Sequence, residues 1–246
     1  SAERRCTLIV DAASGAERAR EGTLCDERTS PASSFKIALS VMGFDSGILI
    51  DQTHPVWPYL EEYRASRPAW RQSIDPTLWL RESVVWYSQK LTRTMGLERF
   101  RRYVDGFAYG NRDISGDAGK QNGLTNAWLS SSLQISPVEQ AAFLRKLLHD
   151  QLPASQEAQR KTRATIATYQ AKNGWTVHGK TGTGSQVGAN GTLDDSRQFG
   201  WFVGWADANG RPLIVVRLIK DDAAIEESAG FRARDSLLAE LPNPVK

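Results

Sequence analysis

Strand-forming segments lie at both ends of this sequence of 246 residues, and helix-forming segments fill its middle. Residues 6–10 and 18–25 are expected to form a hairpin around a turn at 14–17. Further strands are expected in the last third, at 176–182, 199–206 and 212–219. Because both ends supply strands, we expect one antiparallel sheet shared by the two ends, with the helical region inserted between them.

The predicted fold is therefore mixed α/β, of the α+β kind, in a single domain spanning residues 1–246. The sheet is expected from about 1–30 and 160–246, and the helical region from about 33–160. A cleft is expected where the two parts meet.

Three segments carry helix signals. Residues 33–45 are apolar almost all round, which is typical of a buried central helix. Ser136 and Glu139 form a capping box with Pro137 at the first helical position, so a helix is expected from there to about residue 149. Residues 231–241 are amphipathic and are expected to form the closing helix.

The sequence contains two cysteines, Cys6 and Cys25. The midpoint between them falls inside the predicted turn at 14–17, so a hairpin folded there places the two sulfur atoms opposite each other. A disulfide could close in an oxidising compartment, and two buried thiols are the alternative.

Composition excludes several classes of protein. Lys and Arg number 31 against 28 Asp and Glu, a net charge of +3, which argues against a dedicated nucleic-acid binder. No apolar run approaches the roughly 18 residues of a membrane-spanning helix. With two Cys and three His, a Cys/His zinc site is not expected, and we predict no metal. Residues 1–5 lack an apolar stretch, so we expect any export signal to be absent from this sequence.

Ser33-Ser34-Phe35-Lys36 stands at the start of the predicted central helix. In a helix, Ser33 and Lys36 lie one turn apart on the same face. A serine hydroxyl needs a base to become a nucleophile, and a lysine held among apolar groups can lose its charge and serve as that base. A helix N-cap followed by a solvated lysine is the alternative interpretation of this motif alone.

Lys180-Thr181-Gly182 lies on a predicted strand. The lysine and the threonine can present a cation and a hydroxyl to a substrate carboxylate, and the glycine permits close approach of the backbone. Taken alone, the segment could equally be a strand running into a loop. Together with Ser33 and Lys36, in this order, it matches the motif order of penicillin-recognising serine enzymes.

The Ser-Asp-Asn motif of the common branch of those enzymes is absent, and other motifs stand in order instead. They are Ser83-Val84-Val85, Tyr109-Gly110-Asn111, Trp128-Leu129, Lys180-Thr181-Gly182 and Trp201-Phe202-Val203-Gly204. With these motifs the whole sequence resembles the class D, oxacillinase-type serine β-lactamases. The resemblance implies a helical lobe against an antiparallel sheet, export to the periplasm, and antibiotic resistance through hydrolysis of the β-lactam ring.

The resemblance also implies catalytic roles. Ser33 would be acylated, and Lys36 would be carboxylated by carbon dioxide or bicarbonate to N6-carboxylysine, the general base. No dissociable cofactor is implied. Ser83 would relay a proton to the leaving nitrogen. The indole N–H of Trp128 would donate to the carbamate, because an indole is a donor only. The backbone N–H groups of Ser33 and Thr183 would form the oxyanion hole.

Small-molecule β-lactams are the implied partners. Lys180, Thr181 and Gly182 would bind the substrate, with Arg232 or its neighbour Arg234 at the substrate carboxylate. Val85 and Leu129 would provide apolar contacts in the substrate pocket. Core packing for Val85 and Trp128, and a surface helix position for Arg232, are the alternative interpretations. Tyr109, Asn111, Trp201 and Gly204 are expected to be structural.

Two other functions share the scaffold: the β-lactam sensor domain of a membrane receptor, and a peptidoglycan transpeptidase or carboxypeptidase. Val85, where the latter would more often carry Asn, favours the β-lactamase. A Gly/Asn/Asp-rich loop is expected at 185–198 beside the cleft, where it would influence which β-lactams are accepted. The sequence does not indicate the preferred β-lactam subclass or the oligomeric state.

Overall fold

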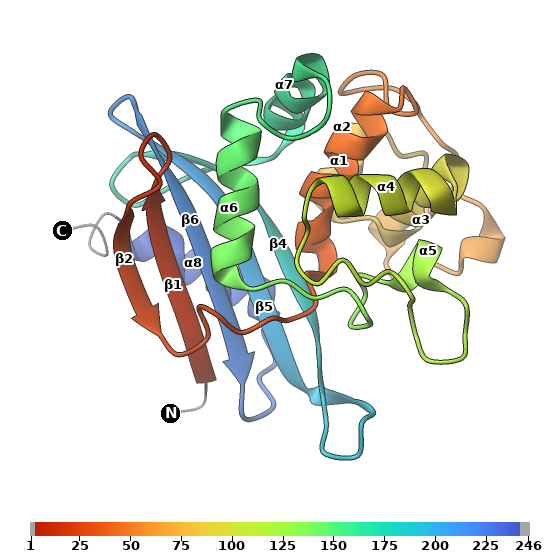
Figure 1. The fold of residues 1–246 in the computed structure, drawn as a ribbon. Helices are drawn as coiled ribbons and strands as arrows, with labels where there is room; N and C mark the ends of the chain where they lie inside the picture. The colour runs from red at the N-terminus through yellow and green to blue at the C-terminus, as the bar shows by residue number, and fades with distance from the viewer. Residues whose placement is uncertain (1–2, 242–246) are drawn as a thin grey trace.

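The computed structural model describes residues 3–241 and places a six-stranded antiparallel sheet beside a group of helices (Figure 1). The strand order is β2-β1-β6-β5-β4-β3. The strands are β1 (Glu3–Asp11), β2 (Glu17–Gly22), β3 (Thr168–Gln170), β4 (Thr176–Val187), β5 (Leu193–Ala208) and β6 (Arg211–Asp221). Because β1 pairs with both β2 and β6, the two ends of the chain share one sheet, which confirms the predicted fold class.

Helices cover both faces of the sheet. They are α1 (Lys36–Asp45), α2 (Pro76–Glu82), α3 (Val85–Met95), α4 (Leu97–Gly106), α5 (Gly123–Asn126), α6 (Pro137–Leu148), α7 (Gln156–Thr165) and α8 (Ala229–Glu240), with short 3-10 turns η1 (Ala32–Phe35), η2 (Glu61–Tyr63) and η3 (Pro68–Trp70). In Figure 1, α6 crosses the front of the sheet and α8 lies behind it. The predicted capping box of Ser136 and Glu139 begins α6.

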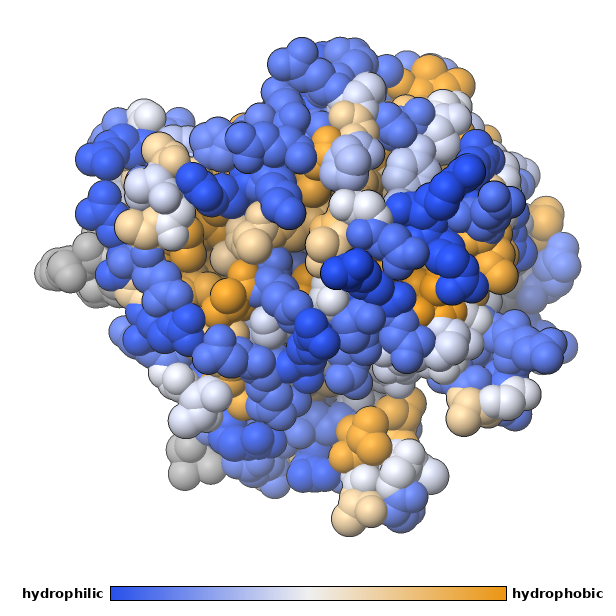
Figure 2. Space-filling model, in the orientation of Figure 1, coloured by the Kyte–Doolittle hydropathy of each residue, from blue (hydrophilic) through white to orange (hydrophobic). Residues whose placement is uncertain are grey.

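Alternation along the strands divides the interior into two cores. In β5, Trp201 and Val203 belong to the core shared with the helical region, whereas Phe202 between them packs with α8. Hydrophilic residues cover most of the face drawn in Figure 2, with apolar residues in separate patches. Within residues 3–241, no helix has both the length and the apolar character needed to cross a bilayer.

The predicted central helix is buried on all sides, from Lys36 to Phe44. It starts later than expected, because Ala32–Phe35 form the 3-10 turn η1 before the α-helix begins. Cys6 and Cys25 form a disulfide with Cα atoms 5.0 Å apart, which confirms the bridge and excludes the alternative of two thiols.

The predicted loop at 185–198 is wrong for most of its length. β4 continues to Val187 and β5 begins at Leu193, so the two form a long hairpin with a register shift between Ser185 and Gln186. The tight turn is closed by a bond from the Gly188 N–H to the Thr192 carbonyl at 2.7 Å. Pairing of the backbone along the ladder overrides the low strand propensity of the Gly, Asn and Asp residues here.

Candidate active site

Ser33 and Lys36 come together as their spacing predicts. Ser33 lies in η1 and Lys36 is the first residue of α1, and Lys36 Nζ donates to Ser33 Oγ at 3.0 Å. Ser33 is partly exposed, whereas Lys36 has no exposed surface. The hydroxyl therefore faces the solvent side of a contact whose amine is enclosed.

Burial favours the uncharged form of the Lys36 amine. Desolvation is the main cause that lowers the pKa of Lys36 well below its usual value, and the charges of Lys180 and Arg67 lower it further. Among residues 3–241 no carboxylate forms an ion pair with Lys36. A neutral amine can accept the proton of Ser33, and it is also the form of lysine that reacts with carbon dioxide.

Aromatic side chains surround the start of α1. Phe35, next to Lys36 in the chain, packs against Tyr109 and Trp128, with ring centroids 5.0 and 5.5 Å apart. The indole Nε1 of Trp128 is buried and has no hydrogen-bond partner in the structure. A buried donor without a partner costs about 1–3 kcal/mol. An acceptor placed next to Trp128 Nε1 would remove this cost.

Lys180 forms the second lysine–serine pair. Its Nζ donates to Ser83 Oγ at 3.1 Å and to the Thr181 carbonyl at 3.0 Å. Burial lowers the pKa of Lys180 to about 7, and the positive charges of Arg67 and Arg234 contribute to the same shift. Since Ser83 joins α2 to α3 and Lys180 lies on β4, this pair connects the helical region to the sheet.

Gly182 allows β4 to lie against η1. A Cβ atom at this position would stand 2.8 Å from the Pro31 carbonyl oxygen and 3.0 Å from the Ser34 nitrogen. Backbone atoms cannot give way as a flexible side chain could, so any larger residue would push β4 away from the segment that carries Ser33. Close approach of the backbone at Gly182 is thus seen between β4 and η1, and the predicted contact of Gly182 with substrate stays a prediction.

A pocket of about 300 Å³ lies between β4 on one side and the helical region on the other. Seven predicted site residues line it: Ser33, Ser83, Val85, Leu129, Thr181, Gly182 and Thr183. Three more predicted residues, Lys36, Trp128 and Lys180, are buried and do not line it. Two lining residues connect the pocket to the buried amines. Ser33 accepts a hydrogen bond from Lys36, and Ser83 accepts one from Lys180.

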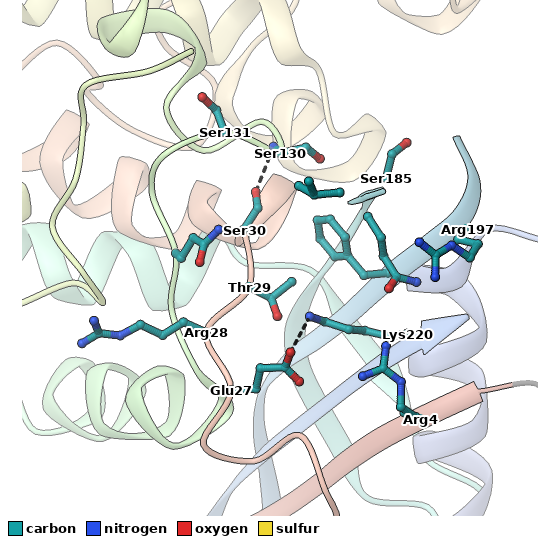
Figure 3. A pocket seen from close by; sticks show the side chains of 14 residues that line it. Arg4, Glu27, Arg28, Thr29, Ser30, Ser130, Ser131, Ser185, Arg197 and Lys220 are labelled. Atoms are coloured by element: carbon teal, nitrogen blue, oxygen red, sulfur yellow. Dashed lines mark hydrogen bonds and ion pairs between the residues drawn. The ribbon is translucent and has the colours of Figure 1, made fainter. Parts of the chain in front are cut away.

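A neighbouring pocket of about 350 Å³ shares Ser130 and Ser185 with this one (Figure 3). Its cations are paired with carboxylates: Lys220 with Glu27 at 3.3 Å, and Arg4 with Asp222 at 3.6 Å. The neighbouring pocket lacks the Ser33–Lys36 pair, so the catalytic candidate is the pocket that Ser33 lines.

Arg232 does not reach the pocket, so the structure does not support the substrate contact predicted for it. Its guanidinium pairs with the buried Asp221, with Nη1 to Oδ1 at 3.0 Å, and Nε donates to the Glu227 carbonyl. Phe231 lines the pocket instead. Neighbouring residues of a helix point about 100° apart, so Phe231 and Arg232 cannot face the same cavity.

Arg234, the other predicted candidate, also does not line the pocket. Its guanidinium carbon lies 4.8 Å from the ring centroid of Phe231 and 5.3 Å from that of Tyr169, and Nε donates to Asp235 at 2.8 Å. Its charge nevertheless acts on Lys180.

Ser185 and Leu193 line the pocket from the segment 185–198, which was expected beside the cleft. Sequence reasoning missed other residues of the pocket wall: Arg67 and Trp70 from the loop before α2, Ser130, and Ser228 and Phe231 at the start of α8. The loop around Arg67 carries no motif. Ser228 Oγ lies 2.8 Å from Thr183 Oγ1, a contact between segments 45 positions apart that no local pattern signals.

Three lining residues, Ala32, Ser83 and Ser130, have left-handed backbone conformations with φ of 47°, 56° and 51°. Such a conformation costs about 1 kcal/mol or more for a residue with a side chain, and the cost is characteristic of functional sites.

The residues expected to be structural hold the site from behind. Asn111 Nδ2 donates to the Ser132 carbonyl at 2.9 Å, and Asn111 Oδ1 accepts from the Gln134 N–H at 3.0 Å. The indole of Trp201 donates to the Ser30 carbonyl at 2.8 Å, next to the start of η1. Tyr109 packs against Phe35 at the start of α1, and Gly204 lets β5 lie close to β4 at His178 and Gly179.

Comparison with known proteins finds chains that are similar in sequence and in overall fold. Residues 6–243 match the family described as penicillin binding protein transpeptidase domain. Beta-lactamase OXA-9 of Klebsiella pneumoniae is 47% identical over 239 residues, covering 97% of this chain and 87% of the relative. Beta-lactamase OXA-1 of Escherichia coli is 36% identical, covering 96% and 83%. The crystal structure of OXA-427 class D beta-lactamase superposes with a TM-score of 0.90 and 44% identity over 97% of each chain.

The pKa of Lys180 predicts how stability depends on pH. The folded chain releases this proton near pH 7, while the unfolded chain keeps it until about pH 10.4. Between these values the unfolded state binds more protons, so the free energy of unfolding rises with pH, by at most about 1.4 kcal/mol per unit. Lys180→Met is expected to lose this component, as measured by urea denaturation from pH 7 to 9.5.

The exposed Lys172 provides the matched control, because Lys172→Met removes the same charge without changing a buried group. Parallel pH profiles for wild type and Lys180→Met would contradict the lowered pKa.

Proposed function

This chain belongs to the class D β-lactamases, and on that basis we propose that it hydrolyses the β-lactam ring of penicillin-type antibiotics through a covalent acyl-enzyme on Ser33. One observation carries the proposal: the partly exposed hydroxyl of Ser33 contacts a buried amine, that of Lys36, at 3.0 Å. A neutral base within hydrogen-bond distance is what a serine needs to become a nucleophile.

In the acylation step, Ser33 Oγ bonds to the ring carbonyl carbon, and its proton passes to the base at Lys36. The carbonyl oxygen becomes an oxyanion, which the backbone N–H groups of Ser33 and Thr183 stabilise. The ring C–N bond then breaks, and Ser83 relays the proton taken up at Lys36 to the leaving nitrogen, which frees the base for the second step. The bond between Ser83 and Lys180 supports this role, because Lys180 with a pKa near 7 can supply or hold a proton.

In the second step, water attacks the ester carbon and gives its proton to the base at Lys36. The ester bond to Ser33 breaks, the serine regains a proton, and the opened acid leaves. The same base thus serves both half-reactions.

We further propose that carbon dioxide carboxylates Lys36. The residues present fit such a group, because the amine is enclosed, burial lowers its pKa, and Trp128 Nε1 is a buried donor without a partner. Trp128 would hold the carbamate by this N–H, satisfying a buried anion that would otherwise lack a partner. In this form Lys36 supplies a carboxylate-like oxygen as the general base. No metal or dissociable cofactor enters the proposal.

For the substrate we propose contacts from both walls of the pocket. Thr181 and Thr183 offer hydroxyl groups from β4, and Val85 and Leu129 offer apolar surface from the helical side. Gly182, which also lines the pocket, brings β4 against the backbone of η1 and so holds these hydroxyl groups close to Ser33.

The disulfide between Cys6 and Cys25 supports an oxidising compartment, since such bonds persist there and are rare in the cytosol. We propose the periplasm, where destruction of β-lactams would confer antibiotic resistance.

Turnover tests the proposed function. Mixed with excess chromogenic cephalosporin, the wild type is expected to complete many turnovers, and mass spectrometry should show an acyl adduct on Ser33. Ser33→Ala should form no adduct and lose about 10⁴-fold or more in kcat, because the nucleophile is gone. Ser46→Ala, at the far end of α1, is the control. One stoichiometric burst with a stable adduct would favour a sensor, and a wild type without adduct would refute the role of Ser33.

The partnerless indole makes a separate prediction. Trp128→Phe keeps a large aromatic ring but removes the N–H, so carbamate on Lys36 should be harder to retain. The bicarbonate concentration for half-maximal activity should rise about tenfold or more, the equivalent of one lost buried hydrogen bond to a charge. Turnover and the carbon-13 carbamate signal measure it in parallel.

Trp175→Phe, at a partly buried tryptophan packed against the core on the α8 side of the sheet, is the control. An unchanged bicarbonate requirement in Trp128→Phe would show that the indole does not hold the carbamate.

A further inference from the structure

The proposed substrates carry a carboxylate on the ring fused to the β-lactam, and the pocket needs a cation for it. The two arginines of α8 that the sequence suggests are engaged elsewhere. Arg232 pairs with the buried Asp221, and Arg234 is held between the rings of Phe231 and Tyr169 and bonds to Asp235. Neither lines the pocket that contains Ser33.

Arg67 lines that pocket from the helical region, on the loop between α1 and α2. It precedes η3, and its side chain is exposed. Within residues 3–241 no carboxylate forms an ion pair with it, in contrast to Arg232 and to the cations of the neighbouring pocket. The guanidinium is therefore available to an anionic ligand.

Trp70 holds Arg67 in place. The guanidinium carbon lies 5.3 Å from the centroid of the Trp70 ring, a cation–π contact. Trp70 is itself fixed twice: its Nε1 donates to the Glu82 carbonyl at 2.9 Å, and its own carbonyl accepts from Trp86 Nε1 at 2.7 Å. An arginine stacked on a fixed ring loses less conformational freedom when it binds a carboxylate.

The positive charge of Arg67 acts on the pKa of both buried lysines, Lys180 and Lys36. It is the largest charge contribution to the lowered pKa of Lys180, and it also lowers the pKa of Lys36. Lys180, with a pKa near 7, is charged in only part of the molecules at neutral pH, whereas a guanidinium keeps its charge. Arg67 is the permanent cation of the pocket wall.

We propose that Arg67 binds the ring carboxylate of the substrate from the helical wall, while the hydroxyls of Thr181 and Thr183 approach it from β4. The proposal rests on the proposed function and assigns the cation that α8 does not provide. A planar guanidinium can bind both oxygens of a carboxylate in parallel, which would orient the ring before Ser33 attacks.

The experiment compares benzylpenicillin with its methyl ester, which lacks the negative charge. The wild type is expected to prefer the acid. In Arg67→Gln, kcat/KM for the acid should fall about 10- to 100-fold, mainly through KM, while kcat/KM for the ester changes less than threefold. Arg67→Lys should restore part of the preference, because it keeps the charge but not the fork.

Arg64→Gln provides the matched control, since it removes one arginine charge from the same loop outside the pocket. Arg232→Gln should also leave the acid-to-ester ratio unchanged. If Arg67→Gln lowers kcat/KM equally for the acid and the ester, Arg67 acts on the pocket structure or on the pKa of the lysines and does not bind the carboxylate. If neither falls, the carboxylate is bound without it. A wild type that does not turn over benzylpenicillin would overturn the proposed function itself, which the same assay reveals first.

Discussion

The site depends on an amine buried without an anionic partner. An enclosed lysine that kept its charge would be very costly, so burial lowers the pKa of Lys36 and favours the neutral amine. The neutral form is the one that can act as a base, and its nitrogen lies 3.0 Å from Ser33 Oγ. The same enclosure leaves the Trp128 indole without a partner, a second unfavourable feature that a carbamate on Lys36 would relieve. The buried amine of Lys36 and the unpartnered indole N–H of Trp128 each cost stability, and the proposed reaction uses both groups.

The rest of the fold maintains this enclosure. The sheet, built from both ends of the chain, presents β4 to η1, and Gly182 lets the two backbones meet. Lys180 reaches across the junction to Ser83. Positive charges then act on one another across the cleft: Arg67 lowers the pKa of both lysines, and Lys180 lowers that of Lys36. The pKa values of the two buried amines are thus lowered jointly by burial and by neighbouring positive charges.

Much of the site could be predicted because its residues are related by local geometry. Ser33 and Lys36 are one helical turn apart, and the strand at Lys180 is visible in the sequence. Cys6 and Cys25 were related by the centre of a hairpin. The resemblance to class D enzymes, carried by the motifs, added Ser83 and Thr183, which also line the pocket.

The remaining features depend on tertiary structure. Of the alternatives open for Arg232, the structure does not support the substrate contact, because one residue of helical phase decides which side chain faces the cavity, and Phe231 lines it. The β4–β5 hairpin was missed because ladder bonds outweigh the propensities of its polar residues. Arg67 lies in a loop without a motif, and only the fold places it across from β4.

The charge of Lys36 tests the account most directly. In protein with carbon-13 and nitrogen-15 labelled lysine, kept free of carbon dioxide, the Lys36 side-chain signal can be identified by its loss in Lys36→Met. The account predicts that its chemical shifts are those of a neutral amine at pH 7, far below the usual pKa of 10.5. Shifts of a charged ammonium persisting to pH 9 would contradict it.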